Sequence, residues 1–320
     1  CGSGASRLVS GNLNLYEQLE VKLARFKNTS SALVFNSGYM ANLGVITSLM
    51  QEGDVIFSDE LNHASIIDAC RMSRAEVVIF RHRDAESLEG LMKTKKGCRK
   101  LIVTDGVFSM EGDIAPLPDL ARIAGQYSAL LMVDDAHATG VLGKRGSGTA
   151  EHFGLEGRVD IQMGTLSKAL GGFGAYIAGD DELRDYLINT ARSFIFTTAL
   201  PPAVLASSIA ALEVIEENPG LRERLWENVR SFKPRVQALG FRITGTETPI
   251  IPVIIGEPHL TVQMAKMLFD EGVWMQAIRP PAVPEGTSRL RIALMTTHTT
   301  EELEIALHAL EKVGRKLRVI

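Results

Sequence analysis

The strongest constraint on the fold is a regular alternation of two kinds of segment along the first two thirds of the chain. Short apolar runs rich in β-branched residues alternate with amphipathic runs of helical period. The former are residues 54–59, 75–80, 100–107 and 129–136, and the latter are 63–73, 85–94 and 117–127. Strands separated by such helices form a mainly parallel sheet covered on both faces. The sequence therefore predicts an α/β fold.

The pattern changes after Pro201 and Pro202. A long helical stretch (203–240) leads to strand-like segments at 241–256 and 288–295, which are separated by a helical segment and followed by another. A chain of 320 residues is too long for one compact core. We therefore predict a large domain over 1–214 and a smaller α+β domain over 215–320.

Composition excludes several classes of function. The chain is 45% hydrophobic and 22% charged, with a formal net charge of -4, so it lacks the basic surface of a nucleic-acid or anionic-membrane binder. No apolar run approaches the roughly 20 residues of a membrane span. Cys1, Cys70 and Cys98 are too widely spaced for a disulfide framework or a metal site, and we expect a reducing, cytoplasmic setting and no metal. The loop-like opening CGSGASRLVSG has no initiator methionine, so we expect an N-terminal segment to be missing.

Polar side chains gather where the predicted strands end. In an open parallel sheet, ligands bind at the carboxyl ends of the strands. The candidates at these ends are Asp59, His63, Asp105, Ser109, Glu111, Asp134, Asp135, His137, Thr165, Ser167 and Lys168. Each alone has a plain structural explanation, because such residues commonly cap helices or sit on solvated turns. Four strand ends that converge on one rim favour a functional site.

The combination of a lysine, a buried aspartate and a phosphate-binding turn fits one coenzyme. A desolvated lysine amine can form an imine with a carbonyl such as that of pyridoxal phosphate (PLP). An aspartate on a buried strand, Asp134, would keep the pyridine nitrogen protonated. Ser37 and Gly38 open a predicted helix whose N-terminus, with the Thr165 and Ser167 hydroxyls, could bind the phosphate.

Four motifs then resemble one family. In chain order they are FNSGYMAN, DGVFSMEGDIAPL, VDDAHATGVLG and GTLSKALGGFGAYIAG. They are similar to motifs of the α-oxoamine synthases, which occur in the same order in that family. The α-oxoamine synthases are PLP-dependent acyltransferases of fold type I, the aspartate aminotransferase-like fold. The resemblance implies condensation of an amino acid with an acyl-CoA or acyl carrier protein thioester, with release of CoA and CO2, in a homodimer.

The resemblance also implies roles for single residues. Lys168 would form the imine, Asp134 would contact the pyridine nitrogen, and His137 the ring hydroxyl. His63 would stack on the ring, and Thr198 would reach the phosphate in the partner subunit. The implied catalytic residues are Lys168, His63, Asp134 and His137. The implied cofactor-binding residues are Gly38, Tyr39, His63, Ser109, Asp134, His137, Thr165, Lys168 and Thr198.

The C-terminal segment bears on the substrate. Residues 273–294 resemble the branch of the family that joins L-alanine to pimeloyl-CoA or its carrier-protein thioester in biotin synthesis. There Arg291 would bind the amino-acid carboxylate, Arg279 would lie near the acyl chain, and His63 would also contact substrate. Ala282 stands where that branch usually has threonine, and Tyr16 where the family commonly has histidine. Residues 308–320 resemble instead the branch that joins glycine to acetyl-CoA, and broad acyl-CoA tolerance is a further alternative.

Other classes of protein fit less well. A P-loop would need glycine where Ala138 stands and a hydroxyl residue where Arg145 stands. A serine hydrolase would need a G-x-S-x-G turn, which the segment around Ser109 lacks. A non-catalytic binding protein on the same fold would be expected to lose Lys168 or Asp134, and both are present.

Overall fold

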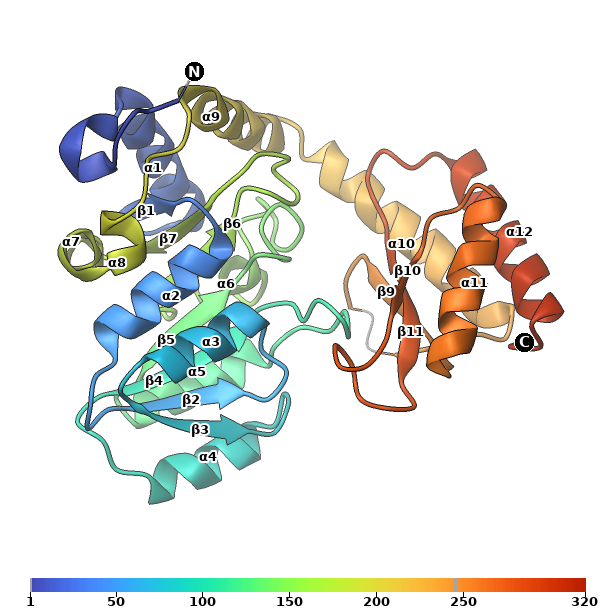
Figure 1. The fold of residues 1–320 in the computed structure, drawn as a ribbon, viewed down its shortest axis with the longest axis horizontal. Coiled ribbons are helices and arrows are strands. Elements are labelled where there is room, and N and C mark those ends of the chain that lie inside the picture. The colour runs from blue at the N-terminus through green and yellow to red at the C-terminus, as the bar shows by residue number, and fades with distance from the viewer. Residues whose placement is uncertain (1, 245–246) are drawn as a thin grey trace. The chain divides into compact units, whose positions relative to one another are not determined.

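The computed structural model describes residues 2–244 and 247–320 (Figure 1). The chain divides into two compact units. The first comprises Cys1–Val107 and Ala115–Asn218, and the second comprises Phe108–Ile114 and Pro219–Ile320. The second unit thus takes a short segment from the middle of the chain. The domain bounds predicted from the sequence, 1–214 and 215–320, stay a prediction.

A seven-stranded sheet forms the centre of the first unit, with strand order β1-β7-β6-β5-β4-β2-β3. The strands are β1 (Ser31–Phe35), β2 (Val55–Asp59), β3 (Glu76–Phe80), β4 (Lys100–Asp105), β5 (Leu130–Asp134), β6 (Ile161–Thr165) and β7 (Ala175–Gly179). β3, β2, β4, β5 and β6 pair in parallel, and β7 is antiparallel to both of its neighbours. The predicted mainly parallel sheet is confirmed.

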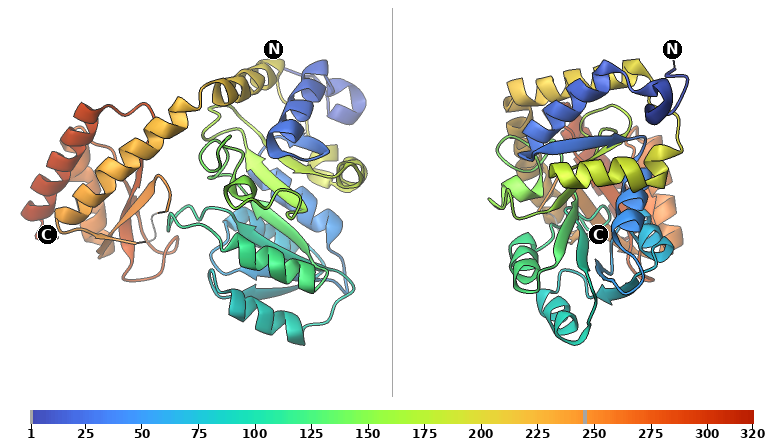
Figure 2. Two further views of the ribbon diagram at one scale, coloured as in Figure 1. Left: turned by 180° about the vertical axis from the view of Figure 1, so that it is seen from behind. Right: turned by 90° about the vertical axis from the view of Figure 1, so that its left-hand side faces the viewer.

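Helices cover both faces of this sheet (Figures 1 and 2). On one face, α2 (Gly38–Leu49) packs with α3 (Ala64–Met72), and on the other α1 (Asn14–Lys27) packs with α9 (Pro202–Glu217). Strand β7 shows why: Ala175 and Ile177 join the core under α2, whereas Tyr176 and Ala178 join the core under α1. The remaining helices of this unit are η1 (Arg7–Gly11, a π-helix), α4 (Ala85–Thr94), α5 (Leu117–Gln126), α6 (Thr149–His152), α7 (Asp181–Thr190) and α8 (Arg192–Ile195).

The second unit has an antiparallel sheet of order β10-β11-β9-β8. Its elements are α10 (Gly220–Ala238), β8 (Arg242–Ile243), β9 (Ile250–Gly256), α11 (Pro258–Asp270), β10 (Gln276–Ile278), β11 (Ser288–Ala293) and α12 (Thr300–Lys316). The long helical stretch of the sequence is two helices, because Asn218 and Pro219 separate α9 from α10. A capping box of Thr299 and Glu302 begins α12.

Membrane spans and metal clusters are absent from the described part of the chain. Among residues 2–244 and 247–320, no helix is both long and apolar enough to cross a membrane. In the same ranges, no three His, Cys, Asp or Glu side chains are grouped to hold a metal ion. Cys70 is buried and Cys98 is exposed, and Cys1 lies outside the described residues.

Candidate active site

The carboxyl ends of four parallel strands bring polar residues together in the first unit. Asp105 and Asp134 are directly paired residues of β4 and β5. Asp59 ends the neighbouring strand β2 on one side, and Thr165 ends β6 on the other. All four are buried, with at most 7% of the residue exposed. The predicted convergence of strand ends is therefore present in the structure.

Asp134 is a buried carboxylate held by neutral donors. Asn42 Nδ2 donates to its Oδ2 at 2.9 Å, and the Ala136 N–H donates to its Oδ1 at 2.9 Å. Burial raises the pKa of Asp134, and these two hydrogen bonds and the charge of Lys168 only partly oppose that rise. A cation beside Asp134 would therefore stabilise its ionised form.

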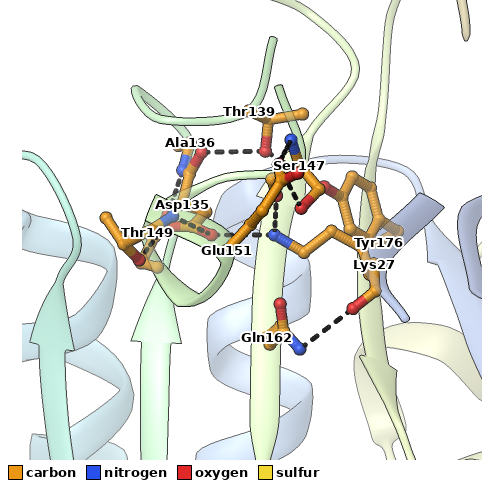
Figure 3. A network of polar contacts seen from close by, with 10 residues as sticks. Lys27, Asp135, Ala136, Thr139, Ser147, Thr149, Glu151, Gln162 and Tyr176 are labelled. Carbon is orange, nitrogen blue, oxygen red and sulfur yellow. Dashed lines mark hydrogen bonds and ion pairs between the residues drawn. The ribbon is translucent and has the colours of Figure 1, made fainter. Parts of the chain in front are cut away.

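The next residue, Asp135, forms an ion pair with a lysine of the same chain (Figure 3). Lys27 Nζ lies 2.7 Å from Asp135 Oδ2, and both side chains are almost fully buried. The Thr149 hydroxyl donates to Asp135 Oδ1 at 2.5 Å, and Lys27 also donates to the Ser147 carbonyl. Burial is the largest single influence and acts to lower the pKa of Lys27, but Asp135, Tyr176 and Glu151 together outweigh it and the net shift is upward.

The N-terminus of α2 has the features of a phosphate site. Ser37 caps the helix through a hydrogen bond from the Met40 N–H, and helix geometry leaves the Gly38 and Tyr39 amides without an intrahelical acceptor. A Cβ at Gly38 would lie 2.9 Å from Met163 Cε and 3.0 Å from Thr165 Cγ2, so a larger residue there would require these side chains to move. Thr165 Oγ1 is buried and lacks a hydrogen-bond partner among the described residues. A phosphate would satisfy these donors, so the residues fit PLP.

His63 lies at the start of α3, on the same face of the sheet as α2. Its Nδ1 accepts from the Ser65 N–H at 3.2 Å, which makes His63 the N-cap. Its own N–H donates to Asp105 Oδ2 at 2.7 Å. Burial and the proximity of Asp134 raise the pKa of Asp105 well above its usual value. The His63 backbone is thus bonded to a buried acid, and its ring is fixed at the start of α3.

Lys168 follows β6 in the loop Leu166–Gly174, and its side chain is exposed. The expectation of a desolvated amine is therefore wrong for this chain by itself, because the residue lies in a loop beyond the strand end and not in the sheet. Its charge nevertheless acts on both Asp105 and Asp134. His137 is half-buried just after β5, and Thr198 is exposed.

Four predicted site residues belong to the second unit: Ser109, Glu111, Arg279 and Arg291. Arg291, on β11, donates from Nε to the Ser109 carbonyl at 2.6 Å, which brings two of them together. Burial lowers the pKa of the Arg291 guanidinium. Arg289, two residues earlier on the same strand face, pairs with Glu111 at 3.1 Å. Arg279 lies just beyond the end of β10 and is exposed.

The two departures from the family pattern have different surroundings. Tyr16 is a core residue of α1, and its hydroxyl accepts the Leu200 N–H at 2.6 Å. It therefore anchors the segment that carries Thr198. Ala282 is exposed, and its N–H donates to the Arg279 carbonyl at 3.1 Å.

Sequence reasoning missed two residues that hold the aspartates. Asn42 was detectable: it lies one helical turn after Gly38 within the FNSGYMAN motif, and asparagine is a poor helix former. Lys27 gave no such signal, because a lysine in the last turn of a helix is ordinary.

The comparisons with known proteins agree with this geometry. The family model for aminotransferase class I and II matches residues 2–310. The 8-amino-7-oxononanoate synthase of Citrifermentans bemidjiense is 55% identical over 322 residues, covering 100% of this chain and 83% of the relative. A solved structure of SPT (serine palmitoyltransferase) with PLP is 35% identical, with a TM-score of 0.96, and the match covers 100% of this chain and 81% of that one.

A solved 8-amino-7-oxononanoate synthase from Francisella tularensis is 32% identical, with a TM-score of 0.83, and the match covers 96% of this chain and 89% of that one. These likenesses confirm fold type I, the aspartate aminotransferase-like fold predicted from the motifs. The chain therefore belongs to the aminotransferase class I and II family and, within it, to the 8-amino-7-oxononanoate synthases, which are PLP-dependent acyltransferases.

Proposed function

We propose that this chain joins L-alanine to a pimeloyl thioester, of CoA or of an acyl carrier protein, and releases CO2 and the thiol. The observation that carries the proposal is Asp134, a buried carboxylate whose two hydrogen-bond donors, the Asn42 amide and the Ala136 N–H, are both neutral. It lies on the rim that also holds Thr165 and the N-terminus of α2. The names of the relatives support the choice of substrates.

Residues of the first unit bind the coenzyme and transfer the proton. PLP, when bound, draws electron density away from the α-carbon of the amino acid. Asp134 holds a proton at the pyridine nitrogen, and His137 orients the ring hydroxyl. Gly38, Tyr39 and Thr165 bind the phosphate. With PLP bound, His63 would stack on the ring, and Lys168 would hold the coenzyme through its amine and would move the proton at the α-carbon.

In the second unit, Arg291 binds the substrate carboxylate. Its guanidinium is partly removed from water, so it gains more from an anionic partner than an exposed cation would. The planar fork suits a carboxylate, and its Nε–H is already fixed by the Ser109 carbonyl. We assign Arg279 to the acyl part of the thioester, and Ser109 to the coenzyme.

We propose further that the active site is shared within a cytoplasmic homodimer, with Thr198 bound to the phosphate held by the partner. Support comes from its exposure and from the fixed backbone around it: Asn36 Nδ2 donates to the Thr198 carbonyl at 2.7 Å. Thr198→Ala should release PLP more readily on dialysis, by about tenfold for one lost hydrogen bond to a charged group. Unchanged retention would contradict the shared site.

Substrate choice is tested by thioester cleavage with alanine or glycine, each paired with pimeloyl-CoA or acetyl-CoA. We expect alanine with pimeloyl-CoA to be fastest. If glycine with acetyl-CoA is faster by a wide margin, the chain acts as a glycine C-acetyltransferase and the proposed substrates are wrong. Similar rates with all pairs would indicate broad specificity.

Lys168→Ala tests the role of this lysine in turnover. The variant should lose turnover while its circular dichroism spectrum stays that of the wild type, because Lys168 lies in an exposed loop. The matched control is Lys93→Ala, which removes an exposed lysine of α4 that pairs with Glu89 at 3.3 Å. Turnover retained in Lys168→Ala would contradict the role of this residue.

A further inference from the structure

His63 makes a hydrogen bond that fixes where its ring carries a proton. Its Nδ1 accepts from the backbone N–H of Ser65 at 3.2 Å, and that N–H can only donate. Nδ1 therefore has no proton while the cap is made. The ring nitrogen left to carry a proton is Nε2. His63 thus meets a ligand as a hydrogen-bond donor through Nε2.

The Ser65 hydroxyl acts on the same nitrogen. Its Oγ lies 2.8 Å from His63 Nδ1, and it accepts from Asn42 Nδ2 at 2.9 Å. Because Nδ1 has no proton to give, the hydroxyl proton must point from Oγ to Nδ1. Ser65 is 2% exposed, so water does not compete for this bond. Two donors from one residue therefore hold the imidazole.

The Asn42 amide donates hydrogen bonds to both Ser65 and Asp134. Its Nδ2 donates to Ser65 Oγ and to Asp134 Oδ2, each at 2.9 Å. The amide cannot be turned over, because its oxygen would then face the carboxylate. Its Oδ1 is buried without a hydrogen-bond partner among the described residues. A buried acceptor without a partner destabilises the fold, so this placement is not explained by stability alone.

These bonds connect the groups proposed to lie at two parts of the coenzyme ring. A continuous series runs from Asp134 through Asn42 and Ser65 to His63. We propose that Asn42 and Ser65 are positioning residues, which hold His63 as its Nε2–H tautomer and tie its orientation to the Asp134 carboxylate. The effect on catalysis rests on the proposed function, whereas the tautomer does not.

The tautomer is measured directly on the coenzyme-free full chain. Histidine labelled with 15N gives long-range 1H–15N correlations that distinguish a protonated ring nitrogen from an unprotonated one. The signals of His63 are those lost in His63→Gln. We expect Nε2 protonated and Nδ1 unprotonated in the wild type, with the Nδ1 resonance shifted upfield by its donors. A protonated Nδ1 would overturn the proposal, and this test needs no variant of Ser65 to fold.

Ser65→Ala should move the Nδ1 resonance downfield, because the hydroxyl donor is lost. In the coenzyme-loaded enzyme, the same variant should lower kcat about tenfold, since a misplaced ring slows a positioned reaction. The control is Ser73→Ala at the other end of α3, where the hydroxyl donates to the Cys70 carbonyl at 2.7 Å. It should leave both the His63 signals and kcat unchanged.

The two measurements separate the possible errors. An unchanged Nδ1 resonance in Ser65→Ala would overturn the assigned hydroxyl bond. A changed resonance with a wild-type kcat would overturn the positioning role. If wild-type enzyme fails to join alanine to pimeloyl-CoA while the Nε2–H tautomer is observed, the proposed substrates are wrong and the assignment of the tautomer stands.

Discussion

Asp134 and Asp135 are neighbours in sequence, and both are buried, yet the chain gives them different partners. Asp135 pairs with Lys27, 2.7 Å away on the α1 side of the sheet. Asp134 points to the α2 side, where Asn42 and the Ala136 N–H give it hydrogen bonds without a formal charge. Alternation along a strand explains the two directions, and the helix on each side supplies the partner.

The difference indicates which of the two carboxylates is structural and which is functional. A buried charge is costly unless a partner compensates it. Lys27 compensates Asp135 within the chain, so that pair can hold α1, the loop at Ser147 and the start of α6 at Thr149. Asp134 is fully compensated only when a cationic group binds beside it. A protonated pyridine nitrogen is such a group.

The largest expected effect is the loss of stability when the buried pair of Lys27 and Asp135 is broken. Lys27→Met removes the cation and leaves Asp135 buried and unpaired, which should lower the free energy of unfolding by about 3–5 kcal/mol. Urea denaturation of the coenzyme-free protein measures it. Lys22→Met, on the same helix, breaks the more exposed pair with Glu213 and should cost about 0–1 kcal/mol. Equal losses in the two variants would contradict the structural role of the buried pair.

The next largest expected effect is the loss of turnover when Asp134 is replaced. Asp134→Asn keeps the shape of the side chain but cannot compensate a cation, so turnover should fall at least about 100-fold. Stability without coenzyme should not fall as it does in Lys27→Met, because no charge is left unpaired. Steady-state kinetics and urea denaturation of the same preparation test both parts. A destabilised but active variant would reverse the roles of the two aspartates.

The smallest effect is a pH dependence of stability. Burial raises the pKa of Asp134 above its usual 3.8, so the folded protein favours the protonated form. This contribution is present below the unfolded pKa and is lost as the pH rises through the folded pKa. Without coenzyme, the wild type should therefore lose stability relative to Asp134→Asn as the pH rises from about 3 towards neutrality. A difference that does not change with pH would contradict an uncompensated Asp134.

The parallel sheet and the polar residues at the carboxyl ends of its strands could be predicted from the sequence. Apolar runs of strand length mark β2, β3, β4 and β5, and the residues that follow them must meet at one rim because the strands are parallel. The position of Asp134 at this rim therefore follows from the sequence pattern alone. The phosphate turn was predictable for a similar reason, because Ser37 and Gly38 signal a helix start.

The partners of these residues could not be predicted, because they depend on how separate elements pack. Lys27 meets Asp135 across 108 residues of sequence. Ser109 follows β4 along the chain, yet its segment belongs to the second unit, where Arg291 and Arg289 hold it. The exposure of Lys168 likewise follows from the path of a loop and not from its composition.

In the proposed mechanism, Asp134 keeps the pyridine nitrogen of the bound coenzyme protonated. Loading the protein with PLP labelled with 15N in the ring, and recording the nitrogen chemical shift near neutral pH, tests it most directly. We expect the shift of a protonated pyridine in the wild type and of an unprotonated one in Asp134→Asn. An unprotonated nitrogen in the wild type, or the same shift in both proteins, would contradict it.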